Sequence, residues 1–308
     1  MSKNNVEHML ALAKNNGILV DPTTVKVNES GLDFLAIFAS TIDGVPWVLR
    51  QPRRDDVVET ARYEKRVLDL VTKHLRVEVP DWQVHTSEFI AYPILGGTPM
   101  ATIDMETKNY DWYLNPESLP ELCIQTWAEA LVELHGIHHD LARDAGIRVK
   151  QPSQARASLR EKMNEIKRVF GVSGALWDRW QKWLADETFW PAHSALVHGD
   201  LHPGHILVAE NGKVTGLLDW TEAEVSDPAI DFTVVYLLFG DTGLADFIQR
   251  YEKAGGRVWS RMHEHIVEMT ASYPVTLATF ALKSGLEEFK TMARQALGVD
   301  ENGIEITS

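Results

Sequence analysis

Apolar and polar residues partly alternate along the N-terminal part of the chain, which is the pattern of half-buried strands. The stretch LDFLAIFAS (32–40) is followed by the turn TIDG and by VPWVLR (45–50), so these residues predict a β-hairpin. Between 57 and 73 the apolar residues recur at helical intervals, which predicts a helix. A further extended stretch, EFIAYPIL (88–95), runs into GGTP, a break that can serve as a hinge.

The pattern becomes mostly helical after this break. Apolar residues at helical spacing predict a helix that runs towards His135, and LWDRWQKWLAD (176–186) predicts another, with its tryptophans in the core. Residues 261–297 are typical of helices separated at a Ser-Tyr-Pro step. The sequence therefore predicts an α+β fold with a small β-rich lobe at 1–93 and a larger helical lobe at 94–308.

Composition narrows the class of protein. The 308 residues are 44% hydrophobic and 24% charged, as in an ordinary globular enzyme. A single cysteine excludes an internal disulfide, and neither a signal peptide nor a membrane span is visible, so we expect a cytoplasmic protein. The net charge of −14 opposes binding to nucleic acid or anionic membranes and would attract a cationic small molecule, although solubility is the simpler interpretation. We expect a monomer without either macromolecular partner.

One segment, LVHGDLHPGHILV (196–208), concentrates the candidate chemistry. It contains His198, His202 and His205 together with Asp200, so it is either a histidine metal cluster or a loop that carries one catalytic carboxylate. The spacing of the histidines would place them on one face of an α-helix, but two glycines and a proline interrupt any such helix. This composition disfavours a transition-metal cluster.

The residues after this segment predict a hairpin around Asn-Gly. A two-residue loop pairs His205 with Leu218, and a three-residue loop pairs His205 with Asp219. Either register brings His205 and Asp219 within about one residue of each other, just after Asp200. Two carboxylates and one imidazole without cysteine indicate a hard cation such as Mg²⁺, which usually arrives with nucleotide phosphates. Asp200 is then free to orient or deprotonate a hydroxyl group.

These motifs resemble the antibiotic-phosphotransferase branch of the protein-kinase-like fold. HGD resembles its catalytic loop, LLDW (217–220) its metal-binding strand end, SDPAIDF (226–232) the segment that braces the loop, and LVELHGI (131–137) the preceding helix end. The resemblance implies the two-lobe kinase-like fold. It also implies a catalytic role for Asp200, metal binding by His205 and Asp219, and supporting roles for His198 and Asp231.

The same resemblance places the nucleotide on the N-terminal lobe. WVLR lies where the family carries its phosphate-binding lysine, the helix after it supplies a glutamate, NESGLDF is the phosphate-covering turn, and IAYPILGG is the hinge. An exposed ion pair is the alternative interpretation of the arginine and glutamate. The residues expected to bind the nucleotide are Ser30, Gly31, Arg50, Glu64, Ala91, Tyr92 and Ile94.

Three features of this chain differ from the general kinase-like pattern, and the differences indicate one particular family within that fold. Arginine replaces the lysine, the turn has one glycine, and His205 replaces an asparagine. Together, VNESGLDF, WVLRQPRR, HGDLHPGH and GLLDWTEAEVSDPAIDF resemble the macrolide 2′-phosphotransferases. This implies transfer of the γ-phosphoryl group of GTP, with ATP as an alternative donor, to the 2′-hydroxyl of the macrolide amino sugar. Mg²⁺ would be the metal, and the result would be antibiotic resistance.

Three residues are candidates for contact with the macrolide, namely His202, Glu222 and Tyr273; solvated side chains are the simpler interpretation of the first two. Other functions remain open at this point. One is another small-molecule kinase of the fold that acts on an aminoglycoside or a choline-like alcohol. A second is a catalytically inactive kinase-like nucleotide-binding module, and a third is a metal hydrolase.

Overall fold

The computed structural model describes residues 3–28, 31, 33–104, 107 and 109–306. The chain divides into two compact units, and it crosses from one to the other several times. The first unit comprises Met1–Leu134, Asp140–Ile147 and Asp200–Ala223, and the second comprises His135–His139, Arg148–Gly199 and Glu224–Ser308. Each unit has its own secondary structure and core, and they are described separately below.

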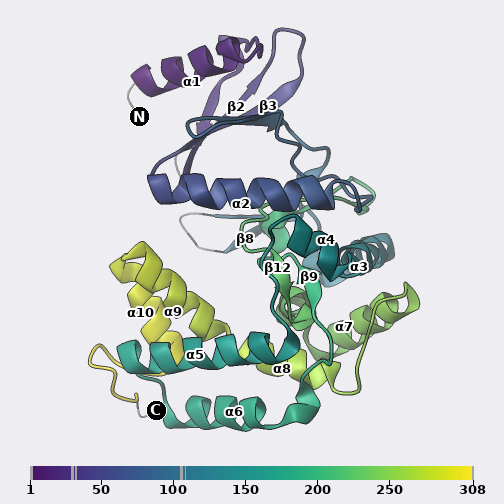
Figure 1. Cartoon of the computed structure of the whole chain (residues 1–308), viewed down its shortest axis with the longest axis vertical. Helices are drawn as coiled ribbons and strands as arrows, with labels where there is room; N and C mark the ends of the chain where they lie inside the picture. The colour runs from purple at the N-terminus through teal and green to yellow at the C-terminus, as the bar shows by residue number, and fades with distance from the viewer. Residues whose placement is uncertain (1–2, 29–30, 32, 105–106, 108, 307–308) are drawn as a thin grey trace. The chain divides into compact units, whose positions relative to one another are not determined.

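The first unit is built on an antiparallel sheet with the strand order β1-β2-β3-β5-β4. The predicted hairpin is confirmed as β2 and β3, with Ile37 opposite Leu49, and the predicted helix is confirmed as α2. Figure 1 shows α1 and α2 on either side of β3, which contacts both helices. These elements are α1 (Lys3–Asn15), η1 (Pro22–Thr24), β1 (Lys26–Asn28), β2 (Phe34–Ser40), β3 (Pro46–Pro52), α2 (Asp55–Val71), β4 (Val84–His85) and β5 (Ile90–Pro93).

Helix α1 was not expected from the sequence. Met9 and Ala13 on its inner face are fully buried against Leu35, Ile37 and other apolar residues of the sheet. Burial of this apolar stripe, and not local helix propensity alone, stabilises such a helix.

The remaining elements of the first unit include the Asn-Gly hairpin. Strands β6, β10 and β11 form one sheet, and β7 pairs with β8 in another. The elements are β6 (Thr98–Pro99), β7 (Ala101–Ile103), β8 (Tyr110–Trp112), η2 (Pro116–Ser118), α3 (Glu121–His135), α4 (His139–Asp144), η4 (Pro203–His205), β10 (Ile206–Val208) and β11 (Val214–Leu217).

Next to His205, the register of β10 and β11 is the one expected for a two-residue loop, and it changes nearer the turn. Ile206 lies opposite Leu217, as for a two-residue loop, but Val208 lies opposite Val214, and the N–H of Ala209 donates to the carbonyl of Lys213. A bulge between Leu207 and Val208 accounts for the difference. The loop is therefore longer than two residues, and the bulge restores the two-residue register next to His205.

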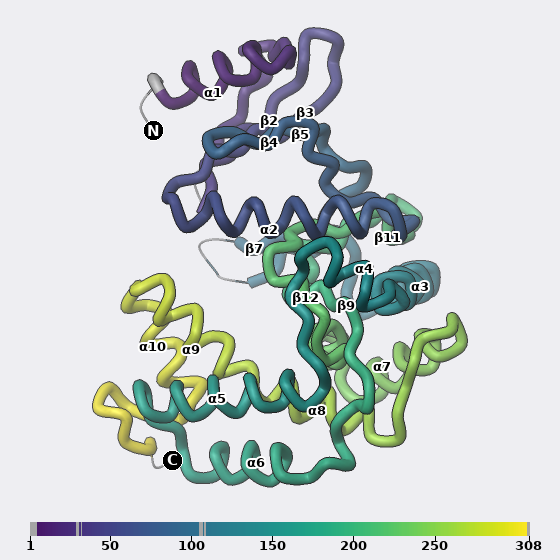
Figure 2. Tube along the Cα trace, in the orientation of Figure 1, coloured from purple at the N-terminus to yellow at the C-terminus, as the bar shows by residue number. Residues whose placement is uncertain are grey.

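The second unit is mainly helical (Figure 2). Its core joins α5, α6, α9 and α10 around Trp180 and Trp183, which confirms that these tryptophans belong to the core. The Ser-Tyr-Pro step separates α8 from α9 as predicted. The elements are α5 (Pro152–Phe170), α6 (Gly174–Ala185), η3 (Glu187–Phe189), β9 (Ala195–Val197), β12 (Glu224–Ser226), η5 (Pro228–Phe232), α7 (Thr233–Lys253), α8 (Met262–Ala271), α9 (Tyr273–Ser284) and α10 (Glu287–Leu297).

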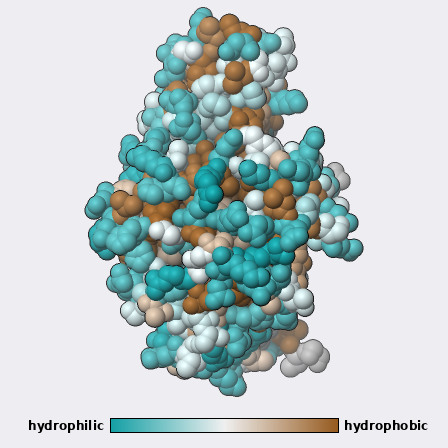
Figure 3. Space-filling view, turned by 90° about the vertical axis from the view of Figure 1, so that its right-hand side faces the viewer, coloured by the Kyte–Doolittle hydropathy of each residue, from teal (hydrophilic) through white to brown (hydrophobic). Residues whose placement is uncertain are grey.

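The surface in one view is mainly hydrophilic. On the face drawn in Figure 3, hydrophilic residues are the most numerous, and hydrophobic residues form smaller patches between them. Among the helices of the described residues, none combines the length and the apolar composition that a bilayer crossing requires.

Candidate active site

A buried carboxylate fixes the backbone directly before Asp200. Asp231, in η5, accepts hydrogen bonds from the backbone N–H groups of His198 at 2.8 Å and of Gly199 at 2.9 Å. Both Asp231 and His198 are fully buried. A buried carboxylate that accepts several hydrogen bonds is rigidly placed, so the two residues that precede Asp200 have a defined conformation.

Two residues without an assigned role in the sequence analysis support Asp231. Nε2–H of His135 donates to the Asp231 carboxylate at 3.1 Å, and the Tyr251 hydroxyl lies 2.9 Å from Nδ1 of the same ring. Burial and the negative charge of Asp231 raise the pKa of Tyr251, so its hydroxyl keeps the proton that it donates to His135. His135 lies in LVELHGI, but no local spacing connects that motif with Tyr251, which is 116 residues away.

Asp200 lies close to two histidines and a second aspartate, and all four residues belong to the first unit. Candidate ligand atoms of Asp200, His202 and His205 lie within 4.8 Å of one another. His205 lies between two carboxylates: its Nδ1 is 3.8 Å from Oδ2 of Asp200, and its Nε2 is 3.8 Å from Oδ2 of Asp219. The hairpin thus brings His205 and Asp219 together.

Although the segment forms no α-helix, His202 and His205 lie side by side. Their ring centroids are 3.8 Å apart, and their Nε2 atoms are 3.0 Å apart. Pro203 does prevent an α-helix, but it begins the 3₁₀ helix η4, for which His202 is the N-cap. With about three residues per turn, a 3₁₀ helix places side chains three positions apart above each other. His198 belongs to the second unit.

This donor set fits a divalent cation. Asp219 and His205 offer an oxygen and a nitrogen ligand that face each other, and Asp200 adds a second carboxylate. Carboxylates with a neutral imidazole and no thiolate favour a hard cation such as Mg²⁺. Asp219 and His205 are the residues that would hold it.

Asp219 has a constrained geometry. Its φ of 61° makes it the one residue other than glycine with a positive φ among the described residues. Aspartate tolerates this left-handed conformation better than most residues, and such conformations cluster at functional sites. The hydroxyl of Thr221 donates to Oδ1 of Asp219 at 2.8 Å, which orients the carboxylate. Thr221 was not among the predicted site residues, because its position two residues later has no distinctive spacing.

Arg50 and Glu64 lie close together, as their strand and helix positions suggested. Nη1 of Arg50 is 3.8 Å from Oε2 of the fully buried Glu64. The Arg50 guanidinium stacks on the ring of Phe34 at 3.8 Å from its centroid. Burial lowers the pKa of Arg50, but the charge of Glu64 and the contact with Tyr92 more than compensate and raise it above its ordinary value.

Glu64 has an unusual protonation equilibrium. Burial raises its pKa from 4.5 to about 7, against the attraction of Arg50, and the carboxylate of Asp219 contributes in the same direction as burial. Oε1 accepts a long hydrogen bond of 3.4 Å from the backbone N–H of Trp220, while no residue in the described part of the chain donates a hydrogen bond to Oε2. An unsatisfied buried carboxylate oxygen that faces an arginine marks a polar site in an otherwise apolar interior.

The remaining predicted residues lie as follows. In the expected hinge, Ala91 and Tyr92 are buried in β5, and the N–H of Ile94 already donates to the carbonyl of Pro46. Glu222 is exposed in the first unit, and Tyr273 is 54% exposed at the start of α9 in the second. Ser30 is outside the described residues, and the neighbouring Gly31 is exposed.

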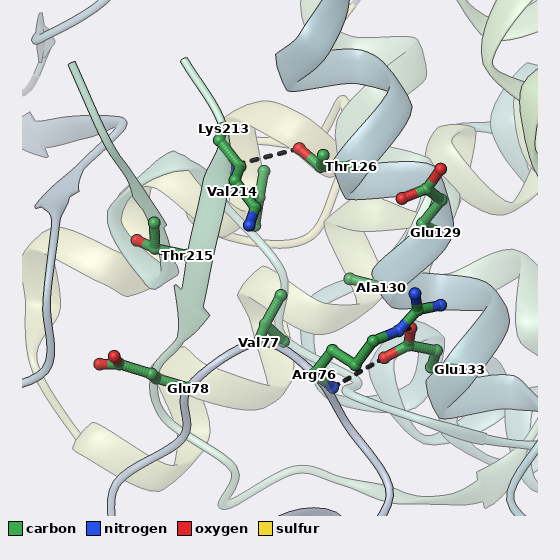
Figure 4. A pocket seen from close by; sticks show the side chains of 10 residues that line it. All are labelled: Arg76, Val77, Glu78, Thr126, Glu129, Ala130, Glu133, Lys213, Val214 and Thr215. Atoms are coloured by element: carbon green, nitrogen blue, oxygen red, sulfur yellow. Dashed lines mark hydrogen bonds and ion pairs between the residues drawn. The ribbon is translucent and has the colours of Figure 1, made fainter. Parts of the chain in front are cut away.

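A separate hollow of about 280 Å³ lies elsewhere in the first unit and is lined by none of these residues (Figure 4). Some of its polar groups are bonded to one another. Arg76 binds Glu133, and the N–H of Val214 donates to the Thr126 hydroxyl at 2.9 Å. Because its lining shares no residue with the candidate active site, the hollow is a separate feature.

Comparison with known proteins agrees with this geometry. Residues 24–265 match the phosphotransferase enzyme family. The uncharacterized protein YcbJ of Bacillus subtilis (strain 168) is 47% identical over 294 residues, which cover 96% of each chain.

Solved structures are also similar. A macrolide 2′-phosphotransferase type I has a TM-score of 0.90 at 39% identity over 98% of this chain and 99% of its own. The macrolide 2′-phosphotransferase MphH from Brachybacterium faecium has a TM-score of 0.88 at 36% identity over 97% and 99% of the two chains. An APH(2″) enzyme solved with GDP and kanamycin has a TM-score of 0.75 at 18% identity over 96% and 97%, which shows the fold alone. The predicted kinase-like fold and the resemblance to macrolide 2′-phosphotransferases are confirmed.

Proposed function

The chain belongs to the phosphotransferase enzyme family, and from this premise we propose that it transfers the γ-phosphoryl group of GTP to the 2′-hydroxyl of a macrolide amino sugar. Its more general activity, phosphoryl transfer to a hydroxyl acceptor, follows from the family and its macrolide-phosphotransferase neighbours. The observation that carries the proposal is the convergence of Asp200, His205 and Asp219. A neighbour of the same fold solved with GDP supports GTP as the donor, with ATP as the alternative.

The proposal gives Asp200 the central role. Its carboxylate is exposed beside His205, so it can orient the acceptor hydroxyl and accept its proton. Asp219 and His205 would hold Mg²⁺, which neutralises charge on the phosphates when bound. His198 and Asp231 keep the preceding backbone in place. Positioning and charge stabilisation provide most of the rate acceleration in such sites.

The nucleotide-binding role of the N-terminal residues is also part of the proposal. Arg50, with Glu64 beside it, would bind the inner phosphates, since a guanidinium matches phosphate geometry in a bidentate way. The turn at Ser30 and Gly31 would cover the phosphates, and Ala91, Tyr92 and Ile94 would meet the base. We also propose that the N-terminal lobe ends at residue 93 and that the helical lobe begins at residue 94.

The acceptor is proposed to be a macrolide because of its chemistry. The amino sugar carries a cationic dimethylammonium group, and the chain has a net charge of −14. His202, Glu222 and Tyr273 remain the proposed contacts. Phosphorylation would inactivate the antibiotic, and we propose that this occurs in the cytoplasm with the protein as a monomer.

Mass spectrometry of erythromycin after incubation with the protein, GTP and Mg²⁺ tests the proposal. We expect the antibiotic to gain one phosphoryl group, and parallel reactions with ATP, kanamycin and choline test the donor and the acceptor. Asp200→Asn should abolish turnover and retain nucleotide binding, whereas Asp178→Asn, at an exposed position of α6, should react like the wild type. Phosphorylation of kanamycin or choline in place of erythromycin would contradict the macrolide assignment.

A further inference from the structure

Two polar side chains of helix α2 are buried, and both bind the backbone that follows Asp219. The other buried residues of α2 are apolar, and Tyr63 and Glu64 are the exceptions. The Tyr63 hydroxyl donates to the backbone carbonyl of Ala223 at 2.6 Å, and Oε1 of Glu64 accepts the N–H of Trp220 at 3.4 Å. All of these residues belong to the first unit. Helix α2 therefore contacts both ends of the short segment between Trp220 and Ala223.

The two contacts differ in strength. The bond from Tyr63 to Ala223 has an ordinary length for an O–H···O hydrogen bond, whereas the bond from Trp220 to Glu64 is about 0.4 Å longer than a typical N–H···O bond. Ala223 is fully buried, so bulk water cannot replace the hydroxyl as a donor to its carbonyl. Tyr63 is thus the stronger of the two links between α2 and this segment.

The residues after Asp219 form a closed turn, which connects Asp219 to the Tyr63 hydroxyl. The N–H of Ala223 donates to the carbonyl of Trp220 at 3.2 Å, so a displacement of Ala223 also displaces the residue next to Asp219. On the other side of Asp219, the N–H of Leu218 donates to the carbonyl of His205 at 2.9 Å. The backbone of Asp219 is therefore fixed by the hairpin on one side and by α2 on the other.

The backbone conformation of Asp219 depends on being fixed in this way. A φ of 61° costs free energy in a residue that has a side chain, and it persists only where the surrounding structure determines it. The bond between Leu218 and His205 fixes the residue before Asp219, and Tyr63 fixes the turn after it. Without the second bond, Asp219 could relax to an ordinary φ, and its carboxylate would turn away from Nε2 of His205, which it now faces at 3.8 Å.

We propose that Tyr63 is a positioning residue for the metal ligand Asp219. Its hydroxyl keeps the turn after Asp219 on α2, so the carboxylate stays in the orientation in which it faces His205. Glu64, which lies beside Arg50, is the next residue of the same helix. Tyr63 therefore also links the metal ligand to the arginine that would bind the inner phosphates. The inference rests on the proposed role of Asp219 as a metal ligand.

The variant Tyr63→Phe removes the hydroxyl and keeps the ring. We expect it to bind Mn²⁺ about fivefold more weakly than the wild type at a saturating concentration of GDP, the effect of losing one buried hydrogen bond. Electron paramagnetic resonance of free Mn²⁺ in a titration of the full chain measures this affinity. Without metal, calorimetry should give an unchanged affinity for GDP, because the contact between Arg50 and Glu64 is retained. Unchanged Mn²⁺ binding, or equal weakening of metal-free GDP binding, would overturn the inference.

Thr24→Val is the matched control for a loss of stability alone. The Thr24 hydroxyl donates to the carbonyl of Asp21 at 2.7 Å and accepts the N–H of Ser40 at 2.9 Å, so this variant also removes a hydroxyl that binds the backbone of the first unit. We expect urea to unfold both variants at lower concentrations than the wild type, and only Tyr63→Phe to bind Mn²⁺ more weakly. If Thr24→Val lost as much Mn²⁺ affinity, Tyr63 would act through stability alone and the inference would fail.

The variant Asp219→Gly distinguishes this inference from the proposed function. Glycine removes the carboxylate and accepts the positive φ, so Mn²⁺ binding should weaken. Unchanged binding would contradict the ligand role of Asp219, and the inference with it. If Asp219→Gly weakens binding and Tyr63→Phe does not, the proposed function stands and only the inference fails. In the Asp219→Gly background, adding Tyr63→Phe should leave the Mn²⁺ affinity unchanged, and a further loss of about fivefold would overturn the inference.

Discussion

Asp231 accepts a hydrogen bond from the backbone N–H of His198 at 2.8 Å, although the two residues are 33 positions apart in the chain. The same carboxylate accepts the N–H of Gly199, so it binds the two residues that come directly before Asp200. Because Asp231 is fully buried, its two carboxylate oxygens have these N–H groups and the N–H of His135 as hydrogen-bond donors in place of water. Fold stability and the position of Asp200 are therefore linked through one side chain.

Substitution of Asp231 by Asn should damage both stability and turnover. An amide offers one oxygen in place of two, so its NH₂ group would face one of the N–H donors that Asp231 now accepts. We expect the free energy of unfolding to fall by about 3 kcal/mol and kcat to fall at least about tenfold. Urea denaturation and the rate of phosphoryl transfer measure the two effects. Asp178→Asn, which removes an exposed carboxylate from the same unit, is the matched control, and equal unfolding midpoints for the two variants would contradict the argument.

Local periodicity was sufficient to predict the elements that frame the site. The β2–β3 hairpin and helix α2 have alternating and helical patterns that depend only on neighbouring residues. The bulge between Leu207 and Val208 was not predictable, because neither residue is of a type that favours a bulge. Helix α1 was missed for a different reason: its stability depends on burial against strands that follow it in the chain.

The candidate site was predictable only in part. Asp200, His205 and Asp219 lie near one hairpin, so the register of that hairpin predicted their proximity. The proximity of His202 and His205 was not predictable from α-helical spacing, because this segment forms a 3₁₀ turn. The contact between Tyr251 and His135 spans 116 positions, and only the folded chain brings the two together.

The pKa of Glu64 predicts a specific pH dependence of stability. In the folded chain it is raised to about 7 from 4.5, so between these values the folded protein holds a proton that the unfolded chain has lost. The corresponding stabilisation is complete below 4.5 and is lost as the pH rises through 7. Relative to Glu64→Gln, the wild type should lose roughly 2 kcal/mol of unfolding free energy between pH 5 and pH 8. Urea denaturation of both proteins at the two pH values measures this difference. If the unfolding free energies of the two proteins changed equally with pH, the pKa of Glu64 would not be raised on folding.

Removal of the Thr221 hydroxyl should weaken metal binding. The hydroxyl donates to Oδ1 of Asp219 at 2.8 Å and so orients the proposed ligand. Loss of an outer partner of this kind typically weakens metal affinity about tenfold or more, and we expect this for Thr221→Val, which preserves the shape of the side chain. Titration with Mn²⁺ and GDP measures the affinity. Thr221→Ser keeps the hydroxyl and should bind like the wild type, so equal weakening in both variants would point to packing instead.

Replacement of Arg50 by lysine should weaken nucleotide binding. Its guanidinium stacks on Phe34 at 3.8 Å and lies 3.8 Å from Glu64, and a lysine ammonium has neither the plane for stacking nor the fork for two phosphate oxygens. We expect Arg50→Lys to raise the KM for the nucleotide about tenfold, with a smaller effect on the KM for the acceptor. Phe34→Leu should produce part of the same change, because it removes the aromatic face and leaves the charge. Arg62→Lys, at an exposed position of α2, is the matched control for the charge-conserving change. An unchanged nucleotide KM in Arg50→Lys would remove this residue from the phosphate site.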